Sequence, residues 1–493
     1  MKKKKIKRIL EIIPGALSWG LMLFFILLFV FKPLAAAVVI IVYLIYWLAR
    51  LFYMTCLMLL ANYRVRSFRK MPWLERCAQI KSDIAFEDVL QVVLFPTYKE
   101  PPQVLIDSLN ALKASNYPKE RMLVVLAGEA REVNSFDKLD GIRKDFSGIF
   151  KDILITIHPK DIEGEIPSKG ANATYASREL KKYLDKQNVD LSKVIISCFD
   201  ADTCTDKNYF ACLAYHFLTN TKRHQISYQP LPVYNNNIYK APALARVMEM
   251  GSMFWQFVEM MRCEKFITFS SHSMSFKTLV DVDYWPVDLV SDDSLIFWKC
   301  FLKFNGDYHT YPLEVPVFMD IAVGKNIVNT FVIQYKQKRR WAWGVENFVF
   351  VGLGFLENNR IGFFLKMRKL YNLLDNHVNW ATWAIVVSFI TPFILYRGTI
   401  IAKDSLVLFN LAYINKVIFN SLTFMMLICI MMSRQFVPAR PKNVSRFFYV
   451  RFIAQWFILP FVSAILGSLP SLDAQTRMMF GNYLGFNVTK KRR

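Results

Sequence analysis

The sequence predicts an α/β domain with a mainly parallel sheet that is inserted between transmembrane helices. Residues 12–31, 376–396 and 452–472 each run for about twenty positions without Asp, Glu, Lys or Arg. A helix needs roughly 20 such residues to cross a hydrocarbon core of about 30 Å. Between these apolar regions, four short runs rich in Val, Ile and Leu each precede a polar, helix-compatible stretch. Strands that alternate with helices in this way are typical of βαβ units.

The composition excludes an ordinary soluble domain and a disordered chain. Of the 493 residues, 54% are hydrophobic and 20% are charged, which is too apolar for either class. The net charge is +23, from 62 basic and 39 acidic residues, and the basic clusters flank apolar segments. This placement favours membrane lipids as partners, with no nucleic acid. The eight cysteines show no metal-ligand spacing, so we expect neither a disulfide framework nor a zinc site.

The apolar segments predict a multi-pass cell-membrane protein. Residues 12–31 and 33–63 form a helical hairpin, in which Arg50 must snorkel or face protein. Residues 64–375 hold most of the charge and are expected to form a cytosolic body. Three further spans are predicted, near 376–396, 405–433 and 447–470. Five spans would place the basic residues 490–493 outside the cell, against the positive-inside rule. Either one segment is re-entrant or the last does not cross, and the sequence leaves both alternatives open.

Four apolar runs inside the body are predicted strands. They lie at 89–96, 122–128, 153–159 and 194–202. The segments between them repeat apolar residues at three- and four-residue spacing, which predicts helices. In such sheets, ligands bind beyond the carboxyl ends of the strands. The residues that directly follow each run are therefore the candidates for chemistry.

Three of these turns carry polar residues. The first strand leads into Thr97-Tyr98-Lys99-Glu100, which taken alone is more typical of an ordinary strand-to-helix turn. Lys169 begins a predicted helix, where a cation opposes the helix dipole unless an anion such as phosphate binds there. The fourth strand leads into Asp200 and Asp202, whose carboxylates can approach Mg²⁺ or Mn²⁺ from one side.

Two later motifs each have a structural and a functional interpretation. Asp292 and Asp293 open a predicted helix, where acidic residues often serve as caps or complement the dipole. Alternatively, one of them is a general base that faces the same pocket as the metal. Residues 337–341, Gln-Lys-Arg-Arg-Trp, lie in an amphipathic basic stretch, which by itself is typical of an interfacial helix with an aromatic anchor.

Together these motifs resemble those of the membrane-embedded family 2 glycosyltransferases, the group that contains cellulose and hyaluronan synthases. P-T-Y-K-E resembles the family's first nucleotide-binding turn, and K-G-A-N resembles its Lys-containing donor segment. D-A-D at 200–202 resembles its metal-binding D-x-D, and S-D-D resembles its T-E-D catalytic motif. Gln337, Arg340 and Trp341 fit its Q-x-x-R-W. After the second strand the family usually carries an Asp that holds the base and ribose, whereas this chain has Glu129.

The resemblance implies a GT-A-type (Rossmann-like) α/β domain, cytosolic and inserted between transmembrane helices. It also implies inverting transfer from a nucleotide sugar, with a UDP-sugar favoured. Asp293 is the implied base, with Asp292 as a cap or orienting neighbour, and Asp200 and Asp202 are the implied ligands of Mg²⁺ or Mn²⁺. The donor-site and acceptor-site candidates are Tyr98, Glu100, Glu129, Lys169, Asp200, Gln337, Arg340 and Trp341.

Three functions remain after this comparison. The first is a polysaccharide synthase, possibly processive, that extrudes its product. The second transfers a single sugar to a lipid acceptor, such as a polyprenyl phosphate or a glycerolipid. The third, a non-catalytic membrane scaffold, is disfavoured because every proposed catalytic carboxylate is present. The expected domains are a transmembrane hairpin (1–65), a glycosyltransferase domain (66–320), interfacial helices with Q-x-x-R-W (321–375) and C-terminal transmembrane helices (376–493).

Overall fold

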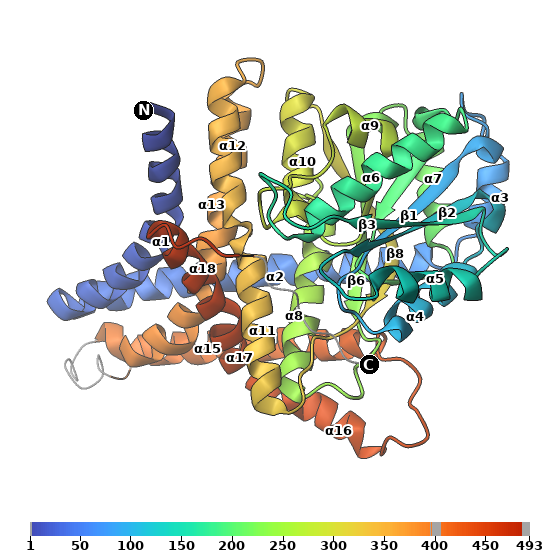
Figure 1. Ribbon diagram of the computed structural model, residues 1–493. Helices are drawn as coiled ribbons and strands as arrows, with labels where there is room; N and C mark the ends of the chain where they lie inside the picture. The colour runs from blue at the N-terminus through green and yellow to red at the C-terminus, as the bar shows by residue number, and fades with distance from the viewer. Residues whose placement is uncertain (1, 395, 397–405, 486–493) are drawn as a thin grey trace.

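A computed structural model describes residues 2–394, 396 and 406–485. Its centre is an eight-stranded mixed sheet with strand order β3-β2-β1-β4-β7-β6-β8-β5 (Figure 1). The strands are β1 (Leu90–Pro96), β2 (Met122–Glu129), β3 (Asp152–His158), β4 (Val194–Cys198), β5 (Cys204–Thr205), β6 (Ile226–Tyr234), β7 (His272–Ser275) and β8 (His309–Met319). The first four are the predicted strands, which confirms that part of the sequence analysis.

The sheet is mainly parallel, as predicted, but it includes two strands of opposite direction. Strands β3, β2, β1 and β4 are all parallel, and so are β6 and β8. Strand β7 runs antiparallel to both β4 and β6, and β5 runs antiparallel to β8. Six of the eight strands therefore run in one direction, which confirms a mainly parallel sheet, and only β5 and β7 oppose them. The sequence analysis did not identify β5 to β8.

Helices cover both faces of the sheet because successive side chains of each buried strand point to opposite faces. On β1, Val93 and Phe95 join one core, whereas Val92 and Leu94 join the other. The first core is closed by α3 (Trp73–Ala78), α4 (Pro102–Lys113), α5 (Ser135–Asp145) and α7 (Tyr209–Thr219). The second is closed by α6 (Lys169–Lys186), α9 (Phe276–Asp281), α10 (Asp292–Lys303) and α12 (Glu346–Glu357).

The chain order reverses between β1 and β4. From β1 the chain steps outward to β2 and β3, then returns through α6 to β4 on the other side of β1. Helices on the two sides of such a reversal diverge and leave a crevice at the carboxyl ends of the strands. The fold therefore places its most favourable ligand position beside the segments that follow β1 and β4.

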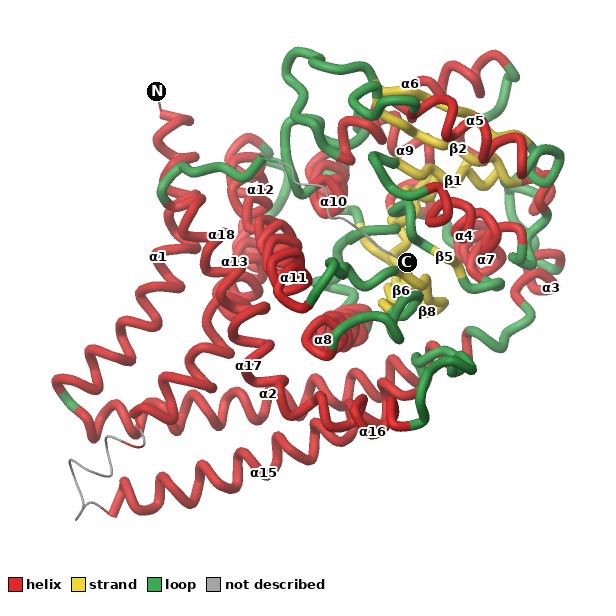
Figure 2. The backbone as a smooth tube through the Cα atoms, turned by 60° about the horizontal axis from the view of Figure 1, so that its bottom comes forward, coloured by secondary structure: helices red, strands yellow, loops and turns green. Residues whose placement is uncertain are grey.

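The remaining helices are mostly apolar. They are α1 (Lys2–Phe31), α2 (Pro33–Phe68), α8 (Ala243–Met260), α11 (Ile327–Ala342), α13 (Phe363–Ile385), α15 (Leu406–Arg434), α16 (Phe447–Ala454), α17 (Leu459–Val462) and α18 (Leu469–Met479). Short 3₁₀ or π segments η1–η8 connect or extend these elements, among them η5 (Trp343–Val345), η6 (Val386–Ile390), η7 (Gln455–Ile458) and η8 (Ser463–Ser468). Helices α2 and α15 lie side by side and extend away from the sheet in both views (Figures 1 and 2).

Five segments are long and apolar enough to cross a membrane, by length and composition. They are Lys3–Phe31, Pro33–Phe68, Phe363–Ile394, Lys416–Arg434 and Phe447–Met479. The predicted spans thus correspond to helices, although residues 395, 397–405 and the basic residues 490–493 lie outside the described part of the chain. Of the two alternatives for Arg50, snorkelling or facing protein, the structure shows the second. Its guanidinium donates to the Tyr46 hydroxyl, and its Nη2 lies 3.2 Å from Oδ2 of Asp375.

An ion pair joins the end of α2 to the sheet. Nη2 of Arg64 lies 2.6 Å from Oε1 of Glu314, a fully buried residue of β8. Burial raises the pKa of Glu314 to about 7, and the charge of Arg64 offsets only part of this effect. The folded chain therefore keeps the Glu314 proton at pH values where the unfolded chain has already released it.

The free energy of unfolding is accordingly expected to fall as the pH rises from about 4.5 to about 7, by roughly 3 kcal/mol for this one carboxyl group. Glu314→Gln should flatten that part of the profile, because an amide stays neutral throughout. Thermal denaturation of the detergent-solubilised chain across this range measures the slope. Asp88→Asn, at an exposed ion pair with Lys193, is the matched control and should leave the slope unchanged. An undiminished slope in Glu314→Gln would contradict the assignment.

Candidate active site

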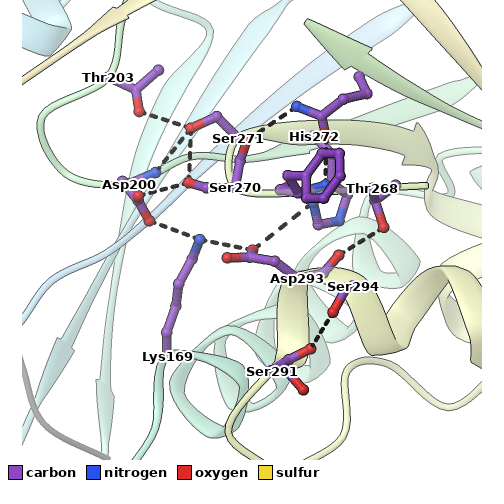
Figure 3. Close-up of polar contacts among 12 residues, drawn as sticks. Lys169, Asp200, Thr203, Thr268, Ser270, Ser271, His272, Ser291, Asp293 and Ser294 are labelled. Carbon is purple, nitrogen blue, oxygen red and sulfur yellow. Dashed lines mark hydrogen bonds and ion pairs between the residues drawn. The ribbon is translucent and has the colours of Figure 1, made fainter. Parts of the chain in front are cut away.

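The candidate site lies where β1 and β4 end. Lys169, the first residue of α6, extends its ammonium group between two carboxylates (Figure 3). Its Nζ lies 2.8 Å from Oδ1 of Asp200 and 2.9 Å from Oδ1 of Asp293. Burial alone would lower the pKa of Lys169, but the two carboxylates outweigh that effect and leave the pKa well above its ordinary value. Three predicted site residues, from three distant segments, therefore meet at one charged group.

The α6 helix presents Lys169 because its start is capped. Ser168 is the N-cap residue, and its Oγ accepts a hydrogen bond from the backbone N–H of Ala171 at 3.1 Å. One turn further in, the Asn172 amide donates to the backbone oxygen of Ala127 at the end of β2. These contacts fix the first turn of α6 against the sheet edge. The prediction of a helix that begins at Lys169 is confirmed.

The two carboxylates that follow β4 differ in environment. Asp200 is about a quarter exposed at its side chain, and its Oδ2 accepts a hydrogen bond from Ser270 Oγ at 2.6 Å. Asp202 is fully buried, and its Oδ2 accepts from the backbone N–H of Asp320 at 2.9 Å. The Asp200 carboxylate is therefore partly accessible and contacts Lys169. The Asp202 carboxylate is buried and bonded to the segment that follows β8.

The paired aspartates at the start of α10 also separate. Asp293 reaches Lys169, and its backbone oxygen accepts a hydrogen bond from Thr268 Oγ1 at 2.6 Å. Asp292 is buried against the first turn of α6, where an added Cβ on Gly170 would lie 2.7 Å from the Asp292 Cβ. Burial, together with the negative charge of Asp293, raises the pKa of Asp292 far above its usual range. Of the two aspartates, Asp293 is the one that forms the ion pair with Lys169.

A carboxylate from α12 holds the turn that precedes these aspartates. Oε1 of Glu346 accepts hydrogen bonds from the backbone N–H groups of Val290 and Ser291, and Oε2 accepts one from the Trp343 indole at 2.9 Å. Glu346 thus ties the start of α10 to the helix pair α11 and α12. This connection couples the position of Asp293 to the segment that carries the Gln-Lys-Arg-Arg-Trp sequence.

Helix α11 carries that sequence to the same region. The Trp341 ring lies 6.0 Å from the ring of Tyr234, the last residue of β6. Lys338 lies 3.5 Å from the centre of the Trp341 ring and forms a fully buried ion pair of 2.7 Å with Glu249 on α8. Gln337 is also buried on α11. One face of the Trp341 ring is therefore covered by the Lys338 ammonium group, which is held in place by its ion pair with Glu249.

The residues after β1 and β2 form a second group along the same edge. Glu100 accepts hydrogen bonds from Thr97 Oγ1 and from the backbone N–H of Tyr98. The Tyr98 ring lies 4.7 Å from the Arg131 guanidinium, which also pairs with Glu129 at the end of β2. Burial raises the pKa of Glu129, although Arg131 opposes that shift. Tyr98, Glu100 and Glu129 are thus brought together, as the sequence analysis expected.

The family follows from a comparison of the chain with known proteins. Residues 195–469, more than half of the chain, match the model of the family described as glycosyl transferase family group 2. The chain belongs to this family. The matched range contains the Asp200–Asp202 turn, the Asp292–Asp293 pair and the Trp341 motif, whereas Tyr98, Glu129 and Lys169 lie before it.

This family 2 glycosyltransferase is also similar to solved structures. The mannosyltransferase PcManGT from Pyrobaculum calidifontis, in complex with GDP-Man and Mn²⁺, matches with a TM-score of 0.40 and 12% identity over 78% of this chain and 98% of that chain. Residues 1–349 of TarS from S. aureus match with a TM-score of 0.36 and 13% identity over 81% and 94%. Comparison with curated protein sequences finds no match. The eight-stranded sheet with helices on both faces confirms the predicted α/β class.

The carboxylates of the site fit a metal ion whose remaining coordination positions are filled by a bound substrate. Among the described residues, no three His, Cys, Asp or Glu side chains are grouped closely enough to hold a metal ion. Asp200 and Asp202 offer two carboxylates, and Mg²⁺ is typically held by one or two carboxylates together with substrate phosphates. The site therefore suits a cation shared with a diphosphate better than a cation enclosed by protein alone.

Several residues of the site were missed by the sequence analysis. The segment 268–273 lies beside the cluster, where Ser270 contacts Asp200 and Thr268 and His272 lie next to Asp293 (Figure 3). His272 is buried with Nδ1 3.9 Å from Oδ1 of Asp293, and burial lowers its pKa, so the ring is neutral. A run of small hydroxyl residues around one His was the available signal, but it fits no strand or helix pattern by itself.

Gly170 is required by the close packing of α6 against α10. An added Cβ would lie 2.7 Å from the Asp292 Cβ and 2.8 Å from the Pro286 carbonyl oxygen. Gly170→Ala should therefore push the start of α10 away from Lys169 and lower both activity and stability, the latter by the 1–3 kcal/mol typical of overpacking. Gly141→Ala, where an added Cβ meets nothing within 4 Å, is the control. Wild-type activity and melting temperature in Gly170→Ala would contradict this packing.

Proposed function

We propose that the chain is a membrane-integrated, inverting hexosyltransferase that adds sugars from a nucleotide-sugar donor to a growing polysaccharide. The main supporting observation is the bridging of Asp200 and Asp293 by Lys169 at the reversal of strand order. A candidate metal-binding carboxylate, a cation and a candidate base thereby lie together at one edge of the sheet. Trp341 from α11 lies against Tyr234 at the end of β6 and offers an aromatic surface for the acceptor sugar.

The donor is proposed to lie along the carboxyl ends of β2, β1 and β4. Tyr98, Glu100 and Glu129 would hold the base and ribose of the nucleotide, for which a UDP-sugar remains our preferred donor. Their clustering around Arg131 places an aromatic ring, two carboxylates and a guanidinium at one position. The diphosphate would then extend toward Asp200 and Lys169, where a cation already faces the edge of the sheet.

In the proposed reaction, Asp293 accepts the proton of the acceptor hydroxyl as that oxygen attacks the anomeric carbon. Lys169 holds the Asp293 carboxylate in place through its 2.9 Å contact, and Thr268 fixes the backbone of the same residue. Mg²⁺ or Mn²⁺ on Asp200 and Asp202 would supply electrophilic stabilisation of the leaving diphosphate. Arg340 would contribute a bidentate contact to phosphate oxygens, and Gln337 and Trp341 would position the acceptor.

The membrane arrangement supports synthesis beside the bilayer. Segments 1–65 and 376–493 are proposed as the transmembrane parts, 66–320 as the catalytic domain and 321–375 as interfacial helices, with the catalytic domain in the cytosol. Helix α2 continues to Phe68 and reaches the sheet through Arg64 and Glu314. The α/β domain is thus joined directly to an apolar helix, which suits release of the product toward the membrane.

The deciding experiment measures both donor use and product length. Purified protein in lipid nanodiscs is incubated with a panel of nucleotide sugars and Mg²⁺ or Mn²⁺, and release of nucleoside diphosphate is scored together with the size of the labelled product. A polymer supports the proposal, whereas a single sugar on a polyprenyl phosphate or glycerolipid favours transfer to a lipid. No diphosphate release with any donor would overturn both. Cysteine introduced at exposed Val133 should resist an impermeant reagent in intact cells if the domain is cytosolic.

A further inference from the structure

The last apolar segment, Phe447–Met479, is long and apolar enough to span a membrane, but its two ends contact the same body of the protein. Just before it, the Tyr239 hydroxyl donates to the Pro438 carbonyl oxygen at 2.6 Å. At its other end, Asp473 lies 2.9 Å from Arg339 of α11. A spanning helix must place its ends on opposite sides of the bilayer. The first end instead lies against the α/β body, and the second lies against α11 and the basic start of α1, where Arg8 donates to the Met478 carbonyl oxygen at 2.9 Å.

The middle of the segment follows the same body. It is divided into α16, η7, α17, η8 and α18, with Pro460 and Pro470 at the starts of the last two α-helices. Arg246 of α8 donates to Gln455 at 2.8 Å, and the Trp456 ring stacks on Phe254 of α8 at 5.7 Å. In Figures 1 and 2 these helices follow one another alongside α8, α11 and α1. The first half of the segment therefore lies along α8, whereas its second half packs on α11, α1 and the start of the apolar part of α13, where Ser468 donates to the Trp380 carbonyl oxygen.

The opposite face of α16, η7 and α17 is an exposed apolar stripe. Its residues recur at three- and four-residue spacing and are each between 54% and 76% exposed. They are Phe447, Val450, Ile453, Phe457 and Phe461. Large apolar side chains on one helical face normally pack against protein or lipid. Because the other face already packs on α8, the stripe is the outer surface of the segment.

The charges around the stripe are all positive. Residues 435–472 contain no Asp or Glu. The basic residues of this stretch are Arg440, Lys442, Arg446 and Arg451, of which the last three are exposed. An apolar face flanked by basic side chains is the pattern of a helix that lies in the headgroup region of an anionic leaflet. The charge pattern thus identifies a lipid surface as the matching partner.

We propose that Phe447–Met479 does not cross the membrane but lies in its interface, where residues 440–461 bind anionic lipid headgroups. This inference rests on the proposed membrane integration of the enzyme. The apolar stripe inserts below the headgroups, and Lys442, Arg446 and Arg451 contact their phosphates. Of the five candidate spans among the described residues, four then cross. An even number satisfies the positive-inside rule for the basic residues 490–493, which five crossings would violate.

Depth measurements test the placement. In the full chain, exposed Cys56 and Cys263 are changed to Ser, and a nitroxide label is attached to a single cysteine introduced at position 450 or 461. The labelled protein is placed in nanodiscs that contain phosphatidylcholine and phosphatidylglycerol. Relative accessibility to oxygen and to a water-soluble nickel chelate reports depth. Both labels should lie about 5–10 Å into the leaflet. In a spanning helix they would differ by about 16 Å along the normal, and that difference would overturn the proposal. Labels at Val38 and Val133 provide bilayer and water references.

Lipid charge is tested with a fluorophore at position 457. Quenching by brominated phosphatidylglycerol should exceed quenching by brominated phosphatidylcholine at equal mole fraction, and the excess should disappear in K442Q/R446Q/R451Q. The control K113Q/K186Q/K303Q removes three exposed lysines of the α/β domain and should retain the excess quenching by brominated phosphatidylglycerol. Equal quenching by both lipids in the parent chain would overturn the lipid preference. Sugar transfer assayed in the same nanodiscs separates the two proposals, because an active enzyme with a deeply buried segment refutes only this inference.

Discussion

Asp293→Asn is expected to lower the rate of sugar transfer by about 10²- to 10⁴-fold, the usual contribution of a general base. The amide cannot accept a proton from the acceptor hydroxyl, but it keeps the shape of the side chain. Donor affinity should stay within a few-fold, because Lys169 and Asp200 remain in contact. Single-turnover rates and donor binding, measured on protein in nanodiscs, separate the chemical step from binding.

The neighbouring residue is the matched control. Asp292 is buried against Gly170, and burial raises its pKa so that it is protonated near neutral pH. A neutral amide resembles that protonated carboxyl group, so Asp292→Asn should keep most of the activity. If Asp292→Asn is the inactive variant, or if Asp293→Asn transfers sugar at nearly the parent rate, the assignment of the base is wrong.

The sequence could predict strands β1 to β4 because they are continuous apolar runs. Strands buried on both faces carry no alternation and stand out as runs of Val, Ile and Leu. Strands β6 and β8 give the opposite signal, since Pro230, Pro232, Pro312 and Pro316 argue against a central strand. The structure accommodates them with an irregular register between Pro230 and Leu231.

Strand β7 could not be predicted from the sequence for a different reason. It has four residues, three of them polar, and its buried Ser273 is satisfied by Ser197 at 2.7 Å and by the Tyr209 hydroxyl at 2.8 Å. Those partners lie on β4 and α7, far away in the sequence. No local pattern can reveal that a polar side chain will be buried when its hydrogen-bond partners come from tertiary structure.

The candidate site was predicted in its residue types but not in its contacts. The residues after β1, β2 and β4 could be expected at one edge, because parallel strands end together. The sequence predicted a bound anion such as phosphate near Lys169, and this stays a prediction. The contacts of Lys169 with the carboxylates of Asp200 and Asp293 were not foreseen. The different burial of Asp292 and Asp293 could not be foreseen, since it depends on how α10 meets Gly170.

Asp202→Asn is expected to reduce turnover by about 10²-fold or more, as removal of one group that stabilises developing charge typically does. Its carboxylate is proposed to hold the divalent cation together with Asp200. Folding should survive, because the amide oxygen of Asn can still accept the hydrogen bond from the backbone N–H of Asp320. Diphosphate release is measured as Mg²⁺ or Mn²⁺ is titrated, with the melting temperature as the check on folding.

The chain contains its own control for this substitution. Asp281 and Asp283 repeat the D-x-D spacing, but they flank the end of α9 and Asp283 is 78% exposed at its side chain. Asp283→Asn removes the same charge from the same pattern and should leave turnover and metal dependence unchanged. The two variants therefore test whether the effect depends on the position of Asp202 after a buried strand or only on the D-x-D spacing. Full activity of Asp202→Asn, or of the parent enzyme in excess chelator, would remove the metal from the proposed mechanism.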